Sequence, residues 1–288
     1  MDPKNRLEPW LYCAPALLIY IFIVVVPVIL SLYQCLYKWD GITEMRFIGF
    51  GNLFEMFSDR IFFTAFKNNL LYSLISVAYQ FTFGMLLAII LTSITFARNF
   101  LKVMCFIPCV ISTVAISQIF MQLLAVSPMG VINVLIDVLG MKPTPFLAQE
   151  NTALISVALV DGYKYCGIYM VIFVSAFAAI SPEIEDAALI DGCNWFQKYF
   201  RIKIPMIRDV CIISLVMLFS GTLKAFEIPF VMTNGGPGAS SELMSTYMYK
   251  TSFNAMSFGY GSMLAVFIFV ECLIVVSIIR KIIPESDY

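Results

Sequence analysis

Several charged side chains stand inside long apolar stretches of the sequence, where a charge is costly unless it meets a partner or water. They are Asp161, Lys164, Lys224, Glu227 and Glu271. The first four form two pairs with a spacing of three residues, which places both members of a pair on one helix face and allows a mutual salt bridge. Alternatively, these groups line a wet path and bind a polar solute, with Tyr165 and Phe226 supplying aromatic faces. The sequence leaves both interpretations open, whereas Glu271 stands alone and needs a partner from elsewhere.

Composition indicates which class of protein could hold these charges. The chain has 288 residues, of which 60% are hydrophobic and 13% charged. A soluble protein cannot hide so much apolar surface, so we expect an integral membrane protein. Histidine is absent and the net charge is -1, which argues against a hydrolytic enzyme and against nucleic acid as a partner. The eight cysteines form no C-x-x-C pattern, so we expect small buried side chains and no metal site.

Six apolar stretches are long enough to cross a membrane as helices, which takes about 18 or more residues. They cover residues 11–36, 69–94, 100–124, 153–180, 210–231 and 258–283. The first is too long for a signal-peptide core, so we interpret it as a retained span. The sequence therefore predicts an all-α, polytopic membrane protein with six transmembrane helices.

Basic residues near the ends of these stretches indicate how the chain is oriented, because cytoplasmic loops carry the excess of lysine and arginine. One side has ten: Lys4, Arg6, Arg98, Lys102, Lys198, Arg201, Lys203, Arg208, Arg280 and Lys281. The other has six: Lys38, Arg46, Arg60, Lys67, Lys142 and Lys250. The first side is predicted to be cytoplasmic, with both termini and the polar segment around residues 182–208 on it.

That polar segment begins with the signals of a short helix. Ser181 can cap the helix and Pro182 suits its first position, and acids including Glu185 follow in the next residues. Asp191-Gly192 is predicted to end the helix, since glycine adopts a positive φ at low cost.

A second helix is predicted directly afterwards. Asn194 and Gln197 have the spacing of a capping box. The aromatic residues between positions 195 and 200 fall on one side, which we expect to pack under the bundle with the bases at the lipid headgroups. Ile204-Pro205 is predicted to end this helix, because the residue before a proline avoids the α region.

The same segment resembles the EAA loop of binding-protein-dependent ABC transporter permeases, whose pattern is E-A-A-x-x-D-G-A followed by I-x-L-P. The matching residues are Asp186, Ala187, Ala188, Asp191, Gly192, Cys193, Ile202, Ile204 and Pro205. Asp186 stands for Glu, Cys193 for Ala and Ile204 for Leu. The resemblance implies that the first helix docks on an ATPase subunit and couples ATP-driven motion to the membrane bundle, with Glu185 beside it.

A second pattern follows the fifth apolar stretch and is similar to the sugar-permease branch of that family. The matching residues are Phe226, Glu227, Thr233, Asn234, Gly235, Gly236, Pro237, Tyr249, Phe253, Gly259, Tyr260, Gly261 and Ser262. Taken alone, residues 233–238 predict a turn on the outer face. A phosphate-binding loop is disfavoured because the Walker frame is missing. The T-x-G-G-P version resembles the first of the two permeases in maltose- and glycerol-3-phosphate-like importers.

Together the two resemblances imply a type I importer subunit that is not itself an enzyme. Its expected partners are a second homologous permease, two ATP-binding subunits, an extracytoplasmic solute-binding lipoprotein or periplasmic protein, and membrane lipid. No cofactor is expected on this chain, because ATP and magnesium would bind the ATPase. The expected location is the bacterial cytoplasmic membrane, and the expected cargo is a sugar or oligosaccharide.

The implied organisation divides the chain at residue 65. Residues 1–65 would hold the first span and first outer loop, and residues 66–288 the five-span permease core. The main alternative is a secondary transporter driven by an ion gradient, which the buried acids allow but which does not need an EAA loop. A membrane enzyme and a non-transporting scaffold are weaker alternatives.

Overall fold

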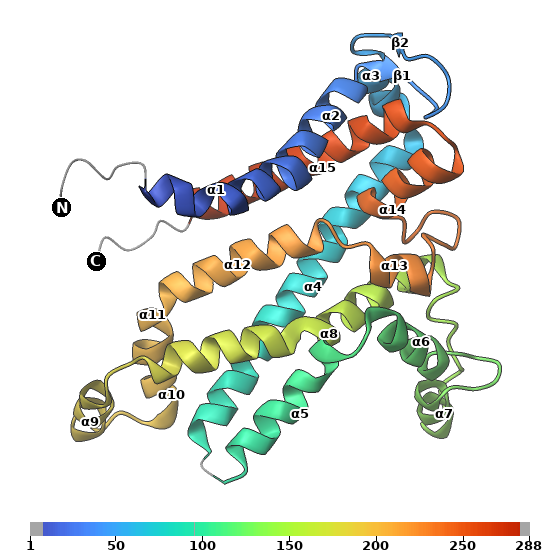
Figure 1. The fold of residues 1–288 in the computed structure, drawn as a ribbon. Helices are drawn as coiled ribbons and strands as arrows, with labels where there is room; N and C mark the ends of the chain where they lie inside the picture. The colour runs from blue at the N-terminus through green and yellow to red at the C-terminus, as the bar shows by residue number, and fades with distance from the viewer. Residues whose placement is uncertain (1–7, 95, 283–288) are drawn as a thin grey trace. The chain divides into compact units, whose positions relative to one another are not determined.

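The computed structural model describes residues 8–94 and 96–282, which are mostly helical (Figure 1). The chain groups into two compact units. One contains Met1–Arg60 and Met248–Phe269, and the other contains Ile61–Tyr247 and Val270–Tyr288. Five helical stretches are long and apolar enough to cross a membrane, or six if one bent pair of helices counts as a span. This agrees with the six spans predicted from the sequence.

The N-terminal unit begins with a long apolar helix. It consists of α1 (Glu8–Tyr20), a π-helical turn η2 (Ile21–Val25) and α2 (Val26–Gln34). A short antiparallel pair, β1 (Tyr37–Lys38) and β2 (Arg46–Phe47), and α3 (Gly51–Ser58) follow. Buried Asn52 joins these parts, since its Nδ2 donates to Cys35 O at 2.7 Å and to Tyr37 O at 2.9 Å. The unit also includes η4 (Lys250–Asn254) and the beginning of α15 (Phe258–Ile282).

The larger unit is built on α4 (Arg60–Ser93) and α8 (Glu150–Ala178). Helix α5 (Arg98–Val110) lies alongside α8 (Figure 1). Gly167 on α8 permits this close approach, because a Cβ there would lie 2.5 Å from Cys105 O of α5. Buried side chains such as Phe173, Met170 and Leu218 then form the core between α4, α8 and α12 (Arg208–Thr222).

The third predicted span exists as two helices. Helix α5 ends at Val110 and α6 (Thr113–Leu123) starts three residues later, with an angle of 95° between them. Ile111 and Ser112 are extended at the bend, with ψ of 140° and 136°. Pro108 lies in the last turn of α5, where a missing N–H weakens the helix. Helix α7 (Val131–Val138) follows α6.

The fifth predicted span is also interrupted. Helix α12 ends at Thr222, and α13 (Glu227–Met232) begins after residues 223–226. A turn then follows in which Asn234 and Gly235 have φ of 46° and 78°. Ser241 Oγ lies 2.5 Å from Gly236 O and 2.8 Å from Thr233 Oγ1, and these contacts close the predicted turn before α14 (Met244–Tyr249).

The polar loop has the predicted first helix. Helix α9 (Pro182–Ile190) starts at Ser181, whose Oγ accepts from Glu183 N at 3.3 Å. It ends before Gly192, which has a φ of +71°. Both the cap and the end are therefore confirmed.

The second helix of the loop starts as predicted and ends later. Asn194 and Gln197 form a reciprocal capping box at α10 (Trp195–Gln197). The prediction that the helix stops at Ile204-Pro205 is wrong, because η3 (Lys198–Lys203) leads directly into α11 (Ile204–Met206). The π-helical turns of η3 have i→i+5 bonding, which makes room for the proline ring that would clash in a regular α-helix.

Candidate functional site: a cavity at the broken helix and a loop that carries α9

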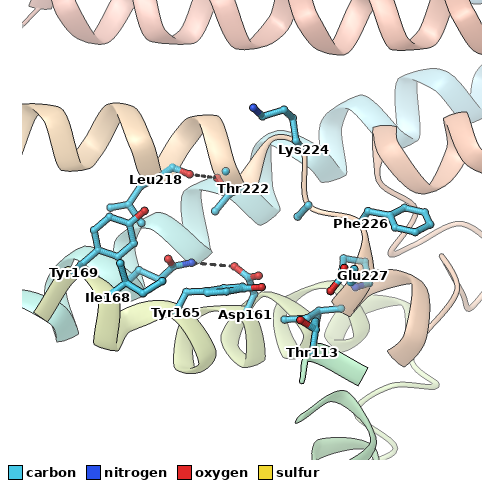
Figure 2. Close-up of a pocket in the computed structure, with 15 residues that line it drawn as sticks. Thr113, Asp161, Tyr165, Ile168, Tyr169, Leu218, Thr222, Lys224, Phe226 and Glu227 are labelled. Carbon is cyan, nitrogen blue, oxygen red and sulfur yellow. Dashed lines mark hydrogen bonds between the residues drawn. The ribbon is translucent and has the colours of Figure 1, made fainter. Parts of the chain in front are cut away.

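A cavity of about 480 Å³ lies in the larger unit, beside the break between α12 and α13. Figure 2 shows side chains from α8 on one side of it and from the break on the other. Its lining residues are Gln80, Thr113, Asp161, Tyr165, Ile168, Tyr169, Leu218, Gly221, Thr222, Lys224, Ala225, Phe226, Glu227, Ile228 and Pro229.

Helix α8 supplies one wall through residues that share a helical face. Asp161 and Tyr169 are buried and Tyr165 is half-buried. Asp161 Oδ2 accepts a hydrogen bond from Gln80 Nε2 of α4 at 2.9 Å, which Figure 2 shows as a dashed line. A buried carboxylate is thus held by a neutral amide from another helix, and a tyrosine face lies beside it.

The break in the fifth span supplies the opposite wall. Residues 223–226 lie outside both helices, and non-helical backbone at membrane depth is tolerated where it lines a cavity. Lys224 and Glu227 are exposed on either side of Phe226. Figure 2 shows the Lys224 side chain directed away from Glu227, and in the described part of the chain no salt bridge joins them. The salt-bridge interpretation of this pair therefore fails, and both groups remain open to a ligand.

Lys164 does not line the cavity, and its ammonium group hydrogen-bonds to backbone carbonyls and not to Asp161. Its side chain is buried, and its Nζ donates to Ile111 O at 2.6 Å and to Pro108 O at 3.4 Å. These carbonyls lie at the C-terminal end of α5, where the helix dipole favours a cation. Lys164 therefore stabilises the 95° bend, and the bend brings Thr113 into the cavity wall.

Glu271 also lies outside the cavity lining. It is 5% exposed, and both of its carboxylate oxygens lie 3.2 Å from Asn69 Nδ2. Asn69 Nδ2 also lies 3.1 Å from Leu223 O at the break. The partner that the sequence required for Glu271 is therefore an amide of α4.

Five of the seven residues proposed for the solute path line this one cavity. They are Asp161, Tyr165, Lys224, Phe226 and Glu227. Sequence reasoning missed Thr113 and Thr222, which come to the wall because helices break beside them. It also overlooked most of the buried polar stripe on α4, although Asn69, Ser73 and Ser76 recur with Gln80 at helical spacing in an apolar helix.

The residues of the EAA-like pattern gather on α9 and the turn behind it. Asp186, Ala187, Asp191, Gly192 and Pro205 are exposed, Ala188 is buried, and Glu185 and Ile202 are intermediate. Leu189 and Ile190 at the end of α9 are 62% and 87% exposed. Exposed aliphatic side chains next to exposed acids form a surface suited to protein contact.

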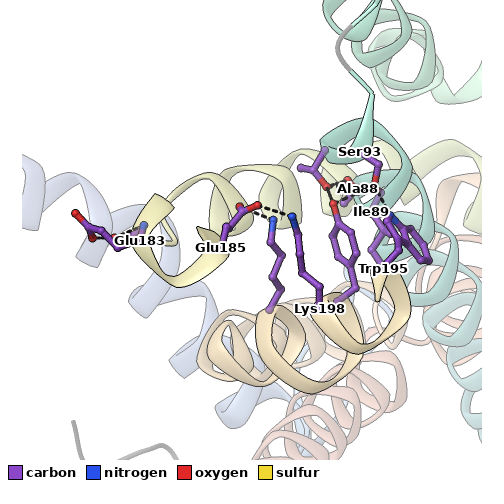
Figure 3. A network of polar contacts seen from close by, with 11 residues as sticks. Ala88, Ile89, Ser93, Glu183, Glu185, Trp195 and Lys198 are labelled. Carbon is purple, nitrogen blue, oxygen red and sulfur yellow. Dashed lines mark hydrogen bonds and ion pairs between the residues drawn. The ribbon is translucent and has the colours of Figure 1, made fainter. Parts of the chain in front are cut away.

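Glu185 differs from its neighbours because its carboxylate forms ion pairs with lysines of the same loop. Its Oε2 lies 2.8 Å from Lys198 Nζ and its Oε1 lies 2.6 Å from Lys203 Nζ. Figure 3 shows it reaching across from α9 to Lys198. Hydrogen bonds from Lys198 and then Lys203 hold the pKa of Glu185 below its ordinary value.

Comparison with curated proteins gives the family. This chain is 30% identical to a probable ABC transporter permease, YurN of Bacillus subtilis, over 95% of its length and 94% of the relative. It is 32% identical to the osmoprotective compounds uptake permease GgtC of Synechocystis, over 89% and 91% of the two chains. The chain belongs to the ABC transporter permeases. A scan against protein-family models returned no match.

Solved structures agree with the permease fold. A chain of a bacterial ABC transporter that imports alginate superposes with a TM-score of 0.85 at 22% identity, over 99% of both chains. A complex of an alginate transporter with a pentasaccharide-bound periplasmic protein gives a TM-score of 0.86 at 22% identity, over 98% of both chains. The chain is a multi-pass permease subunit of an ABC importer and not an enzyme. The alternative of an ion-driven secondary transporter is not supported.

Proposed function

We propose that this permease forms half of the path by which a sugar or oligosaccharide enters the cell. The cavity is the observation that carries this proposal, because it combines a carboxylate, a lysine and hydroxyl groups with tyrosine and phenylalanine faces. Hydroxyl-rich solutes are bound by such polar groups, and their apolar faces pack on aromatic rings. The cavity volume also falls within the range of about 300–1,000 Å³ that is usual for small-ligand sites.

The names of relatives support a saccharide cargo. The chain is 29% identical to the lactose transport permease LacF of Rhizobium radiobacter over 88% of its length. It is 26% identical to the trehalose/maltose permease MalF of Thermococcus litoralis over 92% of its length. Both names describe saccharide transport, so a saccharide is the cargo class that we propose here.

ATP would act through partner chains. In this proposal α9, with Asp186, Ala187, Ala188, Asp191 and Gly192, docks on one of two ATP-binding subunits, which hold ATP and magnesium. A second homologous permease completes the path. An extracytoplasmic binding protein delivers the solute to the outer face. The turn of Thr233, Gly235, Gly236 and Pro237 lies on that face and is partly exposed. The loop and both termini lie in the cytoplasm, and lipid headgroups of the cytoplasmic membrane face the basic residues.

Purification of the tagged chain from its native membrane tests this assembly. The membranes are solubilised in mild detergent, and the proteins that co-purify are identified by mass spectrometry. We expect a second six-span permease and a P-loop ATPase in comparable amounts, with ATP hydrolysis stimulated by a saccharide and its binding protein. A chain that purifies alone, or uptake that survives ATP depletion, would contradict the proposal.

A further inference from the structure

Glu185 and two lysines form a compact ion cluster within the loop, which we call the Glu185 cluster. Glu185 is on α9, whereas Lys198 and Lys203 are on η3, at 2.8 and 2.6 Å from its two oxygens. The Lys203 side chain is only 5% exposed, so its charge depends on this partner. The cluster therefore joins α9 to the helix that returns to the membrane.

Tyr199 extends this connection into the membrane helices. Lys203 Nζ lies 5.0 Å from the centroid of the Tyr199 ring, and Tyr199 is 2% exposed. The hydroxyl of Tyr199 lies 3.1 Å from Thr92 Oγ1 and accepts from Ser93 Oγ at 3.0 Å, at the end of α4. The ring also packs edge-on against Phe177, in the last turn of α8, with centroids 5.8 Å apart.

The helices that Tyr199 contacts, α4 and α8, both contribute side chains to the cavity wall. Helix α4 carries Gln80, and α8 carries Asp161 and Tyr165. Gln80 and Ser93 are 13 residues apart in an unbroken helix, a distance of about 20 Å at 1.5 Å per residue. A displacement of Tyr199 can therefore reach the cavity through rigid helices, since each contact in the series is buried or half-buried.

We propose that Glu185 is a positioning residue that makes α9 and η3 move as one body. Motion imposed on α9 then passes through Lys203 and Tyr199 to α4 and α8, and so to the cavity. Glu185 does not bind the ATPase, because both of its oxygens are occupied by lysines of its own loop. Asp186, the next residue, is exposed and remains available to the partner. This inference rests on the proposed docking of α9.

Hydrogen–deuterium exchange on the purified complex separates docking from coupling. The probes are ATP and orthovanadate, which trap the closed ATPase and require no knowledge of the solute. Protection of peptides from α9 reports docking, and the change on trapping in peptides around Gln80 and Asp161 reports coupling. In Glu185→Gln and Lys203→Met we expect normal protection of α9. We expect the change at the cavity to fall by about fivefold or more, the low end of typical coupling between sites.

Two further variants complete the design. Glu44→Gln removes an exposed acid of the N-terminal unit, outside α9 and the Glu185 cluster, and it should behave as the unmodified protein. Lys198→Met removes the more exposed lysine, whose side chain is 21% exposed, and is the variant least able to disturb folding. It should give a partial loss of the change at the cavity.

The outcomes are distinct. An unchanged response at the cavity in Glu185→Gln, or in Lys198→Met if the other variants do not fold, overturns the proposal. Loss of α9 protection in Glu185→Gln but not in Lys203→Met also overturns it, because Glu185 would then be a docking residue. If the unmodified chain binds no ATPase, the proposed function fails instead, independently of Glu185.

Discussion

The loop that carries α9 and the cavity both hold charged side chains, but they satisfy them differently. In the loop Glu185 meets two oppositely charged groups, Lys198 and Lys203. At the cavity Asp161 is held by the Gln80 amide, and the nearby Lys164 is held by backbone carbonyls. The loop therefore uses ion pairs between its own residues, whereas the membrane helices use neutral groups from distant parts of the chain.

The difference indicates what each region has to do. Ion pairs between α9 and η3 fix two short elements relative to each other, which suits a segment that transmits motion. Neutral partners fix Asp161 and Lys164 without introducing countercharges into the cavity. Lys224 and Glu227 are then the exposed charges of its lining, and they are available to a solute.

The largest expected effect comes from breaking the turn behind α9. Gly192 has a φ of +71°, a conformation that costs other residues roughly 1–2 kcal/mol and β-branched residues more. We expect Gly192→Val to abolish uptake while the binding protein still binds its solute, as measured with proteoliposomes. Gly192→Asn is the control, because asparagine tolerates this conformation. Normal ATP-coupled uptake in Gly192→Val would contradict the role of α9.

The next effect tests the neutral partners of the membrane region. Lys164→Met removes the donor to Ile111 O and Pro108 O, and an unsatisfied buried carbonyl costs about 1–3 kcal/mol. We expect a lower unfolding temperature in detergent and reduced uptake, because the α5–α6 bend and Thr113 shift. Lys142→Met, which removes an exposed lysine of the loop after α7, should change neither. Equal stability of the two variants would show that Lys164 does not hold the bend.

A smaller effect is expected from the charges left open to the cavity. A hydrogen bond to a charged group contributes about 1.5–3 kcal/mol, so Glu227→Gln should raise the half-saturating solute concentration by about tenfold or more. The maximal uptake rate and the unfolding temperature should stay close to those of the unmodified protein. Glu44→Gln, in the exposed segment between β1 and β2, is the matched control. An unchanged half-saturating concentration would remove Glu227 from the binding surface.

The same contrast explains how much could be predicted from the sequence. The caps at Ser181 and Asn194 and the end of α9 at Gly192 were predicted correctly, because their signals lie within a few residues of each other. The continuation of the second helix through Pro205 was not predicted, because it depends on the π-helical geometry of η3.

At the cavity five lining residues were predicted, but their partners were not. Spacing alone suggested a salt bridge between Asp161 and Lys164, yet Gln80 lies 81 positions before Asp161 in the sequence and Ile111 lies 53 before Lys164. Such contacts follow from how the helices pack and where α5 and α12 break. Local spacing in the sequence carries no information about helix packing or about these breaks. The complete set of residues that line the cavity could therefore be identified only from the structure.

The smallest expected effect is the pH dependence of the Glu185 cluster. The lysines lower the pKa of Glu185 below that of the unfolded chain, which is about 4.3. Their stabilisation is therefore fully present above that pKa and is lost as pH falls through the folded value. We compare the unfolding temperatures of the unmodified protein and Glu185→Gln from pH 8 to pH 3. The difference should be small, as for other partly exposed ion pairs, and constant from pH 8 to pH 5. It should shrink as pH falls below about 4.3, because the unfolded chain then binds a proton at this carboxyl while the folded chain keeps it ionised. A difference that disappears between pH 7 and pH 6 would mean that the pKa is raised, and that the lysines do not hold Glu185 in the working protein.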